Sequence, residues 1–230
     1  MDKVYFIACG FPPVGRGNAI TNACVADQLA NDFDVEVICR RPSGDMLLSY
    51  QEDQSLVEGL DPRLKVHRIK AVGWAGLNEL LYAAGVLPCY YLNWAWSAWR
   101  RRGDLLGRDG VLFAVHPLFS GVLLGVWLKR ETGMPLVVDF RDDFAGSLSR
   151  GWRRILAPLY SRLERWVMKQ ADAVTVTTPT LKDWLIERHG IEADCIEVVY
   201  NIVPEVPGED CGKETDAASC ETGREISSEI

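Results

Sequence analysis

The sequence predicts an α/β fold, a Rossmann-like doubly wound parallel sheet with helices on both of its faces. Short runs of apolar and β-branched residues alternate with longer stretches that suit helices, which is the order that builds such a sheet. Most of the short runs are apolar throughout, as expected for strands covered on both sides. The 230 residues, 48% of them hydrophobic, are enough for one well-filled core. We therefore expect one domain over residues 1–204, followed by an acidic, disordered tail over residues 205–230.

Seven runs are predicted to be strands, and in chain order they are 4–8, 35–39, 65–69, 111–115, 136–140, 173–177 and 195–199. Helices are predicted between these strands, at 19–30, over much of 77–101, and at 119–131, 152–170 and 179–189. Asn18 suits the N-cap of the first helix, and Pro158 is expected to start or kink the fourth. The ligand crevice of such a sheet lies beyond the carboxyl ends of its strands, so functional residues are expected there.

Charge and cysteine content narrow the class of protein. Residues 205–230 hold 8 of the 32 acidic residues but only 2 of the 25 basic ones, so nearly all of the net charge of −7 belongs to the tail. The balanced body argues against nucleic-acid binding. Seven cysteines without a C-x-x-C pair favour a reducing compartment over a disulfide framework. The sequence shows neither a signal peptide nor an apolar run long enough to span a membrane, so we expect a cytoplasmic protein.

A glycine-rich turn follows the first predicted strand. Residues 9–18 read Cys-Gly-Phe-Pro-Pro-Val-Gly-Arg-Gly-Asn, and a helix is predicted directly after them. Glycine lets backbone N–H groups approach a phosphate or sugar oxygen at a helix N-terminus, so Gly15, Arg16 and Gly17 are candidate substrate-binding residues. An ordinary turn between strand and helix, with Asn18 as N-cap, would explain the same residues.

Polar side chains also follow the fourth and fifth predicted strands. His116 ends the fourth, where an imidazole can bond a sugar hydroxyl or move a proton, and capping of the next helix is the alternative. The fifth strand runs into Asp139-Phe140-Arg141-Asp142-Asp143. If the strand continues through this segment, alternation sends Asp139, Arg141 and Asp143 one way and Asp142 the other. This crowding of charge predicts a functional site, with a purely local ion-pair network around Arg141 as the alternative.

Four segments, in this order, are similar to those of a known family. They are Pro12-Pro13-x-Gly15-x-Gly17, then Val-Val-Asp-Phe-Arg-Asp at 137–142, then Glu164-Arg165 with Ala-Asp-Ala-Val-Thr-Val-Thr-Thr at 171–178, and finally Val-Val-Tyr-Asn at 198–201. Together they resemble the N-terminal, acceptor-side domain of family 4 glycosyltransferases, one half of a GT-B fold. The resemblance covers about residues 3–204.

The resemblance implies a division of labour between two domains. In that family the N-terminal domain receives the acceptor, the C-terminal domain holds the nucleotide sugar, and the sugar is transferred with retention of configuration, without a cofactor and usually without a bound metal. By position, Gly15 and Gly17 would give backbone contacts to phosphate or acceptor. His116 and Asp142 would position hydroxyls, and Arg141 would neutralise the leaving diphosphate as the catalytic partner of Asp142.

Departures from the family pattern bear on these roles. Arg16 separates two glycines that are adjacent in many members, and Arg141 stands where many have histidine, so no histidine role is carried over to that position. The tail is too short and polar to be the donor-binding domain. We therefore expect the acceptor-binding half of a hexosyltransferase-type enzyme in polysaccharide or glycolipid synthesis, inactive without a donor-binding C-terminal domain. The alternative is a non-catalytic acceptor-binding or membrane-docking subunit of a split glycosyltransferase.

An aromatic segment suggests a membrane surface as a further partner. Residues 74–99 are rich in Trp, Tyr and Leu and end in three arginines at 100–102. In the later predicted helix, Ile155, Leu159, Leu163 and Trp166 share one side, beside an arginine-rich flank. Aromatics beside basic residues suit an anionic headgroup region, and the family often acts on lipid-linked acceptors. The sequence therefore predicts peripheral contact with the inner membrane face, unless these aromatics belong to the core.

A dinucleotide-binding oxidoreductase is a further alternative. Gly15 and Gly17 would then bind the pyrophosphate, and Arg40 and Arg41 would meet a 2′-phosphate. That fingerprint requires glycines directly after the strand, whereas residues 11–14 intervene here, and Ile20 occupies the position of its third glycine. The spacing therefore disfavours this class.

Overall fold

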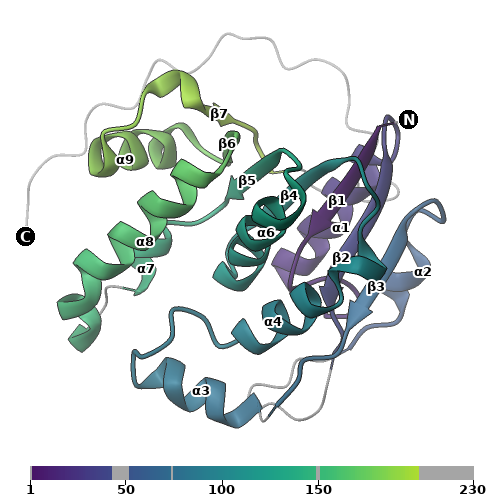
Figure 1. Ribbon diagram of the computed structural model, residues 1–230, viewed down its shortest axis with the longest axis horizontal. Helices are drawn as coiled ribbons and strands as arrows, with labels where there is room; N and C mark the ends of the chain where they lie inside the picture. The colour runs from purple at the N-terminus through teal and green to yellow at the C-terminus, as the bar shows by residue number, and fades with distance from the viewer. Residues whose placement is uncertain (1, 43–51, 74, 149–150, 202–230) are drawn as a thin grey trace, which may run out of the picture.

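Seven parallel strands form a single sheet in the computed structural model, which describes residues 2–42, 52–73, 75–148 and 151–201 (Figure 1). The strand order is β3-β2-β1-β4-β5-β6-β7, so the chain starts at the centre and winds outward first to one edge and then to the other. This order confirms the predicted doubly wound parallel sheet. The predicted acidic tail at 205–230 lies outside the described residues.

Each strand begins and ends within one residue of its predicted bounds. The strands are β1 (Lys3–Ile7), β2 (Asp34–Arg40), β3 (Lys65–Ile69), β4 (Val111–Val115), β5 (Leu136–Phe140), β6 (Ala173–Val176) and β7 (Ile196–Val198). Continuous apolar runs are a strong local signal for strands that are buried on both faces. β1 fits this description, since four of its five residues are buried.

The helices lie between the predicted strands but differ in detail. They are α1 (Gly17–Leu29), α2 (Ser55–Glu58), α3 (Ala75–Ala83), α4 (Leu92–Arg100), α5 (Arg102–Leu105), α6 (Phe119–Thr132), α7 (Phe144–Leu148), α8 (Ala157–Gln170) and α9 (Pro179–His189). Two short 3₁₀ turns cover Gly151–Leu156 and Ala193–Cys195. Pro158 stands in the first turn of α8, where its missing N–H costs no hydrogen bond, as predicted.

The helices add two details to these predictions. The helical content expected over much of 77–101 is confirmed as two helices, α3 and α4, which are separated because Gly85 takes a left-handed conformation with φ of 72° and Pro88 follows it. The predicted N-cap Asn18 lies inside α1, and Arg16 is the N-cap, with an extended backbone at φ −128° and ψ 149°. The Arg16 carbonyl accepts hydrogen bonds from the Ala19 and Ile20 N–H groups at 2.9 and 3.0 Å.

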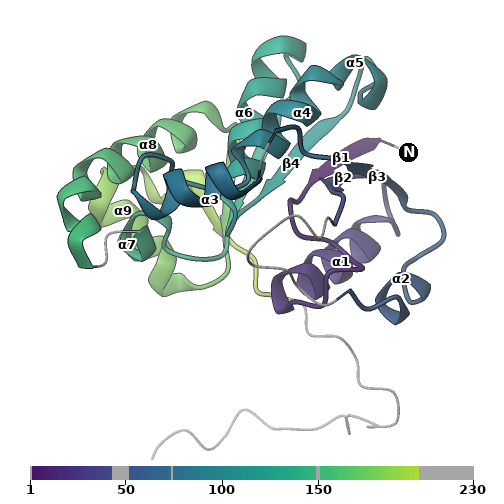
Figure 2. The same cartoon turned by 90° about the horizontal axis from the view of Figure 1, so that it is seen from below.

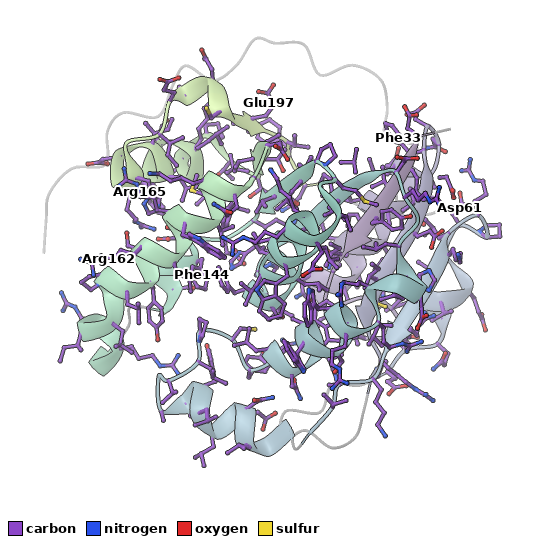
Figure 3. All side chains as sticks on the ribbon, viewed as in Figure 1. Phe33, Asp61, Phe144, Arg162, Arg165 and Glu197 are labelled. Atoms are coloured by element: carbon purple, nitrogen blue, oxygen red, sulfur yellow. The ribbon has the colours of Figure 1, made fainter. Side chains whose placement is uncertain are left out.

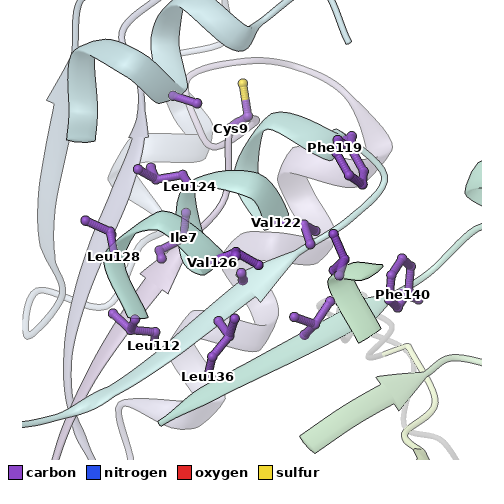
Figure 4. Close-up of a cluster of buried hydrophobic side chains, with 14 of the residues drawn as sticks. Ile7, Cys9, Leu112, Phe119, Val122, Leu124, Val126, Leu128, Leu136 and Phe140 are labelled. Atoms are coloured by element: carbon purple, nitrogen blue, oxygen red, sulfur yellow. The ribbon is translucent and has the colours of Figure 1, made fainter. Parts of the chain in front are cut away.

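The helices cover the two faces of the sheet unequally. α1 packs on one face, where Ala23 and Ala26 meet the β1 and β2 side chains Phe6 and Val37. α4, α6, α8 and α9 pack on the opposite face (Figures 1 and 2). α6 is the central helix of this layer, and its apolar side chains meet Ile7 and others from the middle strands (Figure 4).

Close packing of α6 on the sheet depends on a glycine. A Cβ added at Gly125 would lie 2.8 Å from Ala114 Cβ and 2.9 Å from Leu136 Cδ1. Only glycine lets the helix approach β4 and β5 this closely. Gly125 therefore fixes the position of α6 on the sheet. The N-terminus of α6 lies beside the carboxyl end of β4.

Candidate functional site

The glycine turn after β1 and the charged segment after β5 lie on the same rim of the sheet and are joined by one side chain. Asn22, a 3% exposed residue of α1, donates from Nδ2 to the Gly10 carbonyl at 2.6 Å. Its Oδ1 accepts a hydrogen bond from Arg141 Nη1 at 2.9 Å. The carboxyl ends of parallel strands meet at one edge, and Asn22 links two of them directly. The predicted meeting of these two segments at one rim is confirmed.

The glycine turn faces solvent. Gly15, Arg16 and Gly17 are exposed, and no side chain among the described residues caps the N-terminus of α1. A Cβ added at Gly17 would have no atom within 4 Å, so the space beside this backbone is open. The first N–H groups of a helix have no intrahelical partner and favour negative charge. The turn therefore offers backbone donors to a ligand oxygen.

Arg141 is held beneath the rim. Its Nε donates to Asp139 Oδ2 at 2.7 Å, and the side chains of Arg141 and Asp139 are only 6% and 8% exposed. Thr175 Oγ1 donates to the other oxygen of Asp139 at 2.9 Å. Nη2 of Arg141 is buried without a hydrogen-bond partner among the described residues. The local ion-pair network weighed as the alternative is therefore present.

This placement bears on the role expected of Arg141. Its guanidinium is paired with the Asp139 carboxylate and with Asn22 of α1, and its side chain also lines a pocket of about 340 Å³ beside α1. Alternation along the strand correctly put Asp139 and Arg141 on one side. It could not reveal that α1 covers that side.

Asp142 is exposed. In the part of the chain that the structure describes, its carboxylate has no hydrogen bond or ion pair. Its neighbour Asp143 is anchored instead, with Oδ1 accepting the Gly146 N–H at 2.9 Å and Oδ2 accepting from Arg188 Nη2 at 2.9 Å. Partial burial acts to raise the pKa of Asp143, but the hydrogen bonds from Arg188 and Gly146 hold it below its usual range. Asp142 is thus the carboxylate of this segment that is available to a substrate.

Sequence reasoning missed the residues that hold this segment in place. Glu164 of α8 is fully buried, and its Oε1 accepts the Ala145 N–H at 3.1 Å. Its Oε2 lies 3.1 Å from Arg188 Nη1 and 2.6 Å from His189 Nε2, both on α9. The sequence contained Glu164 only as part of a motif, and no spacing pattern connects it to residues on another helix. These contacts fix residues 143–146 and hence the direction of Asp142.

His116 is buried instead of lying at the lip of the crevice. It is 2% exposed, its ring centroid is 5.7 Å from those of Phe140 and Phe144, and its N–H donates to the Asp139 carbonyl at 2.9 Å. Burial lowers the pKa of His116 to about 3, so the imidazole is neutral at physiological pH. Its Nδ1 has no hydrogen-bond partner among the described residues. The predicted alternative of a helix cap is wrong, because Leu118 is the N-cap of α6.

A hollow of about 90 Å³ opens beside His116. Its walls are mostly aromatic and apolar, from Tyr82, Pro88, Cys89, Tyr90, Pro117, Leu118, Phe119, Phe144 and Ser147. Phe144 lies between α6 and α8 (Figure 3), where it stacks on Phe119 at 4.3 Å. We call this the His116 hollow. Aromatic walls with one imidazole nitrogen suit a neutral group that carries a hydroxyl.

Within the described ranges, no cluster of three or more His, Cys, Asp or Glu side chains is placed to hold a metal ion. The five cysteines described, Cys9, Cys24, Cys39, Cys89 and Cys195, are all free thiols.

Comparison with known proteins agrees with this architecture. A family model described as the glycosyl transferase 4-like domain matches residues 18–201. No curated protein sequence matches the chain.

Solved structures share the fold at low sequence identity. UGT2 of Phytolacca americana matches with a TM-score of 0.55 and 13% identity over 92% of this chain and 53% of its own. UGT71G1 of Medicago truncatula, complexed with UDP-glucose, has a TM-score of 0.54 and 16% identity, over 88% and 51%. Sucrose-phosphate synthase of Thermosynechococcus elongatus has a TM-score of 0.51 and 11% identity, over 81% and 45%. The chain thus spans about half the length of these structures.

Proposed function

Because the chain belongs to the glycosyl transferase 4-like domain family, we propose that it is the acceptor-binding N-terminal half of a retaining glycosyltransferase that uses a nucleotide sugar. Its fold is that of one GT-B half, and its structural neighbours include an enzyme solved with UDP-glucose. One observation supports the proposal above all: Asn22 joins the glycine turn to the segment that carries Asp142. We place its reaction in polysaccharide or glycolipid assembly.

Each rim residue takes a role that its surroundings permit. The exposed carboxylate of Asp142 accepts a hydrogen bond from a hydroxyl of the acceptor or of the transferred sugar. Neutral His116 bonds a second hydroxyl from its hollow. The backbone at Gly15, Arg16 and Gly17 contacts a phosphate oxygen or the acceptor. Arg141 acts indirectly, by holding Asn22 and through it the turn.

A donor-binding C-terminal domain completes the enzyme in this proposal. The structural neighbours are about twice as long as the part that this chain matches. Transfer across a cleft needs the nucleotide sugar held opposite the acceptor, so the chain alone is expected to be inactive. The second candidate is a non-catalytic acceptor-binding or membrane-docking subunit of a split enzyme, which the exposed apolar surface described below favours.

The test is Asp142→Ala, assayed for sugar transfer with the donor-binding domain supplied. We expect transfer to fall by about 100-fold or more, as for loss of a positioned acid or base group. The melting temperature should stay unchanged, since the Asp142 carboxylate has no partner among the described residues. Asp109→Ala is the matched control, because Asp109 is also exposed but precedes β4 at the opposite edge of the sheet. Full activity in Asp142→Ala, or a large loss of stability, would contradict the assignment.

We also propose that the protein rests on the cytoplasmic face of an anionic membrane. No helix in the described portion combines the length and apolarity needed to cross a bilayer. Part of the predicted aromatic surface is core, since Tyr91 and Trp94 are 4% and 0% exposed. Trp74 lies outside the described residues. The predicted side of the later helix is also divided, because Ile155 precedes α8 while Leu163 and Trp166 pack against the core.

An exposed apolar surface remains beside these elements. Leu80 of α3 and Val86 are 63% and 66% exposed, and Ile155 and Leu159 are 85% and 56% exposed. The two segments are in contact, because the Arg153 guanidinium lies over the Tyr82 ring at 4.3 Å and Tyr160 Oη lies 3.5 Å from the Gly85 carbonyl. Arg162 and Arg165 point outward from α8 (Figure 3). Apolar side chains beside arginine favour an anionic interface.

Co-sedimentation with phosphatidylserine vesicles at low salt tests this surface. Leu80→Ser combined with Ile155→Ser should weaken binding, because both side chains would otherwise enter the interface. Trp184→Ser is the control, because Trp184 is an exposed apolar residue of α9 outside this surface, and it should leave binding unchanged. The absence of sedimentation by the unmodified chain would count decisively against membrane contact.

A further inference from the structure

A second hollow on the rim contains a buried cation that has no anionic partner among the described residues. It opens between the glycine turn, the end of β2 and the N-terminus of α6, and it holds about 20 Å³. We call it the Arg40 hollow, and its lining residues are Cys9, Gly10, Val14, Arg16, Asn18, Arg40, Tyr91 and Leu118. The space accepts about one ligand oxygen, with the rest of the ligand outside.

The buried side chain of Arg40 makes few polar contacts with the described residues. It is 7% exposed, its Nη1 donates to the Arg41 carbonyl at 3.3 Å, and its guanidinium lies over the Tyr91 ring at 4.8 Å. No carboxylate within the described ranges lies at ion-pair distance from it. A buried guanidinium is normally paired with an anion, since its burial is otherwise costly. This one hydrogen bond and the Tyr91 ring are its side-chain contacts among the described residues, and neither supplies a negative charge.

The surroundings of Arg40 add positive potential. Arg16 lines the same hollow and is exposed. Arg68, from the end of β3, donates to the Pro12 carbonyl at 3.0 Å. Two acidic residues reach the turn through their backbone. Glu52 pairs with Val14 in an isolated β-bridge, and the Asp53 N–H donates to the Pro13 carbonyl while the Asp53 carboxylate accepts from Ser55. α1, a helix of 13 residues, begins at Gly17 directly beside the hollow. Together these groups favour an oxyanion.

The two hollows share a wall. Leu118 lines both, and the adjacent residues Tyr90 and Tyr91 line one each. One ligand can therefore reach both, with a neutral hydroxyl group beside His116 and an anionic group beside Arg40. The Arg40 hollow lies on the β2 side of β1, away from β5 and Asp142. A group placed there belongs to the molecule that this lobe itself binds.

We propose that the Arg40 hollow binds a phosphate group carried by the acceptor, so that the acceptor is a phosphorylated sugar or glycolipid. The identification of the ligand as an acceptor rests on the proposed function. The identification of its phosphate group rests on Arg40, Arg16 and the start of α1. Arg40 is the specificity residue, since it is the buried donor whose charge a neutral acceptor would leave uncompensated.

The experiment measures binding of inorganic phosphate to the full chain, by thermal-shift titration against chloride at constant ionic strength. We expect phosphate to raise the melting temperature in a saturable way, as a ligand of the native state does. Arg40→Gln should weaken phosphate binding about tenfold or more, which is the usual value of a charge-assisted hydrogen bond. Arg63→Gln is the matched control, because it removes the same charge from an exposed ion pair with Asp61.

A second variant guards against misfolding of Arg40→Gln. Arg16 is exposed, so Arg16→Gln should fold normally and weaken phosphate binding by a smaller factor, about two- to fivefold. Unchanged binding in both variants, or no saturable effect of phosphate on the unmodified chain, would overturn the proposal.

A UDP arm identifies the source of the phosphate. If UDP binds the chain in an Arg40-dependent manner and displaces phosphate, the hollow belongs to the donor and the inference fails. The outcome for the proposed function is separate. If phosphate binding depends on Arg40 but the reconstituted enzyme transfers no sugar, the anion site is supported and the transferase assignment is contradicted. If sugar transfer depends on Asp142 but phosphate does not bind, the transferase assignment is supported and the anion site is contradicted.

Discussion

Replacement of Asn22 should release the glycine turn from the β5 segment. In the Asn22→Ala variant the Gly10 carbonyl loses its donor at 2.6 Å, and Arg141 Nη1 loses its acceptor at 2.9 Å. Arg141 Nη2 already lacks a partner among the described residues, so two nitrogens of one buried guanidinium would be unpaired. Each buried polar group left without a partner costs about 1–3 kcal/mol. Two such groups, the Gly10 carbonyl and Arg141 Nη1, give an expected loss of about 2–6 kcal/mol in the free energy of unfolding.

Urea denaturation of the full chain measures this loss as a lower midpoint at an unchanged slope. Asn31→Ala is the matched control, because Asn31 is exposed just beyond the end of α1 and its hydrogen bonds face solvent. That variant should change stability by less than about 0.5 kcal/mol. Asn22→Asp keeps the acceptor for Arg141 but loses the donor to Gly10, so its loss should be intermediate. An Asn22→Ala variant as stable as the control would refute the proposed link.

Two further predictions concern the sheet and the pH dependence of stability. Gly125→Ala should cost about 1–3 kcal/mol in urea unfolding because its Cβ would meet Ala114 at 2.8 Å, whereas Gly103→Ala, with open space around it, should not destabilise. Burial acts to raise the pKa of Glu36, but hydrogen bonds from Lys3 and two further basic residues lower it to about 2 from 4.5. Its contribution, at most about 3 kcal/mol, is therefore complete above pH about 4.5 and lost as the pH falls toward 2. Glu36→Gln should flatten that part of the stability profile measured by denaturation, and an unchanged profile would disprove the assignment.

The sequence predicted the strands well because their signal is local. A parallel strand that is buried on both faces is mostly apolar, and β4 is apolar along its whole length. The burial of Tyr91 and Trp94 was harder to predict, because both suit a surface aromatic segment as well as a core. Their burial depends on α6, which packs against them from another part of the chain.

The sequence predicted where the candidate site lies on the sheet, but not which of its side chains are buried. Strand ends put the glycine turn and residues 139–143 at one rim, as Asn22 shows. Alternation along β5 separated Arg141 from Asp142, but only the position of α1 shows which of the two is buried. The contacts of Glu164 with Arg188 and His189 join α8 to α9, and no sequence spacing encodes such a pair.

The most direct test of the acceptor-half account is turnover of nucleotide sugars by the purified chain. A panel of nucleoside diphosphate sugars is incubated with the chain alone and with the chain plus a donor-binding domain, and release of the nucleoside diphosphate is measured. The account predicts no release by the chain alone and acceptor-dependent release with both. Release by the chain alone would contradict it, because the donor would then be bound and activated on this lobe.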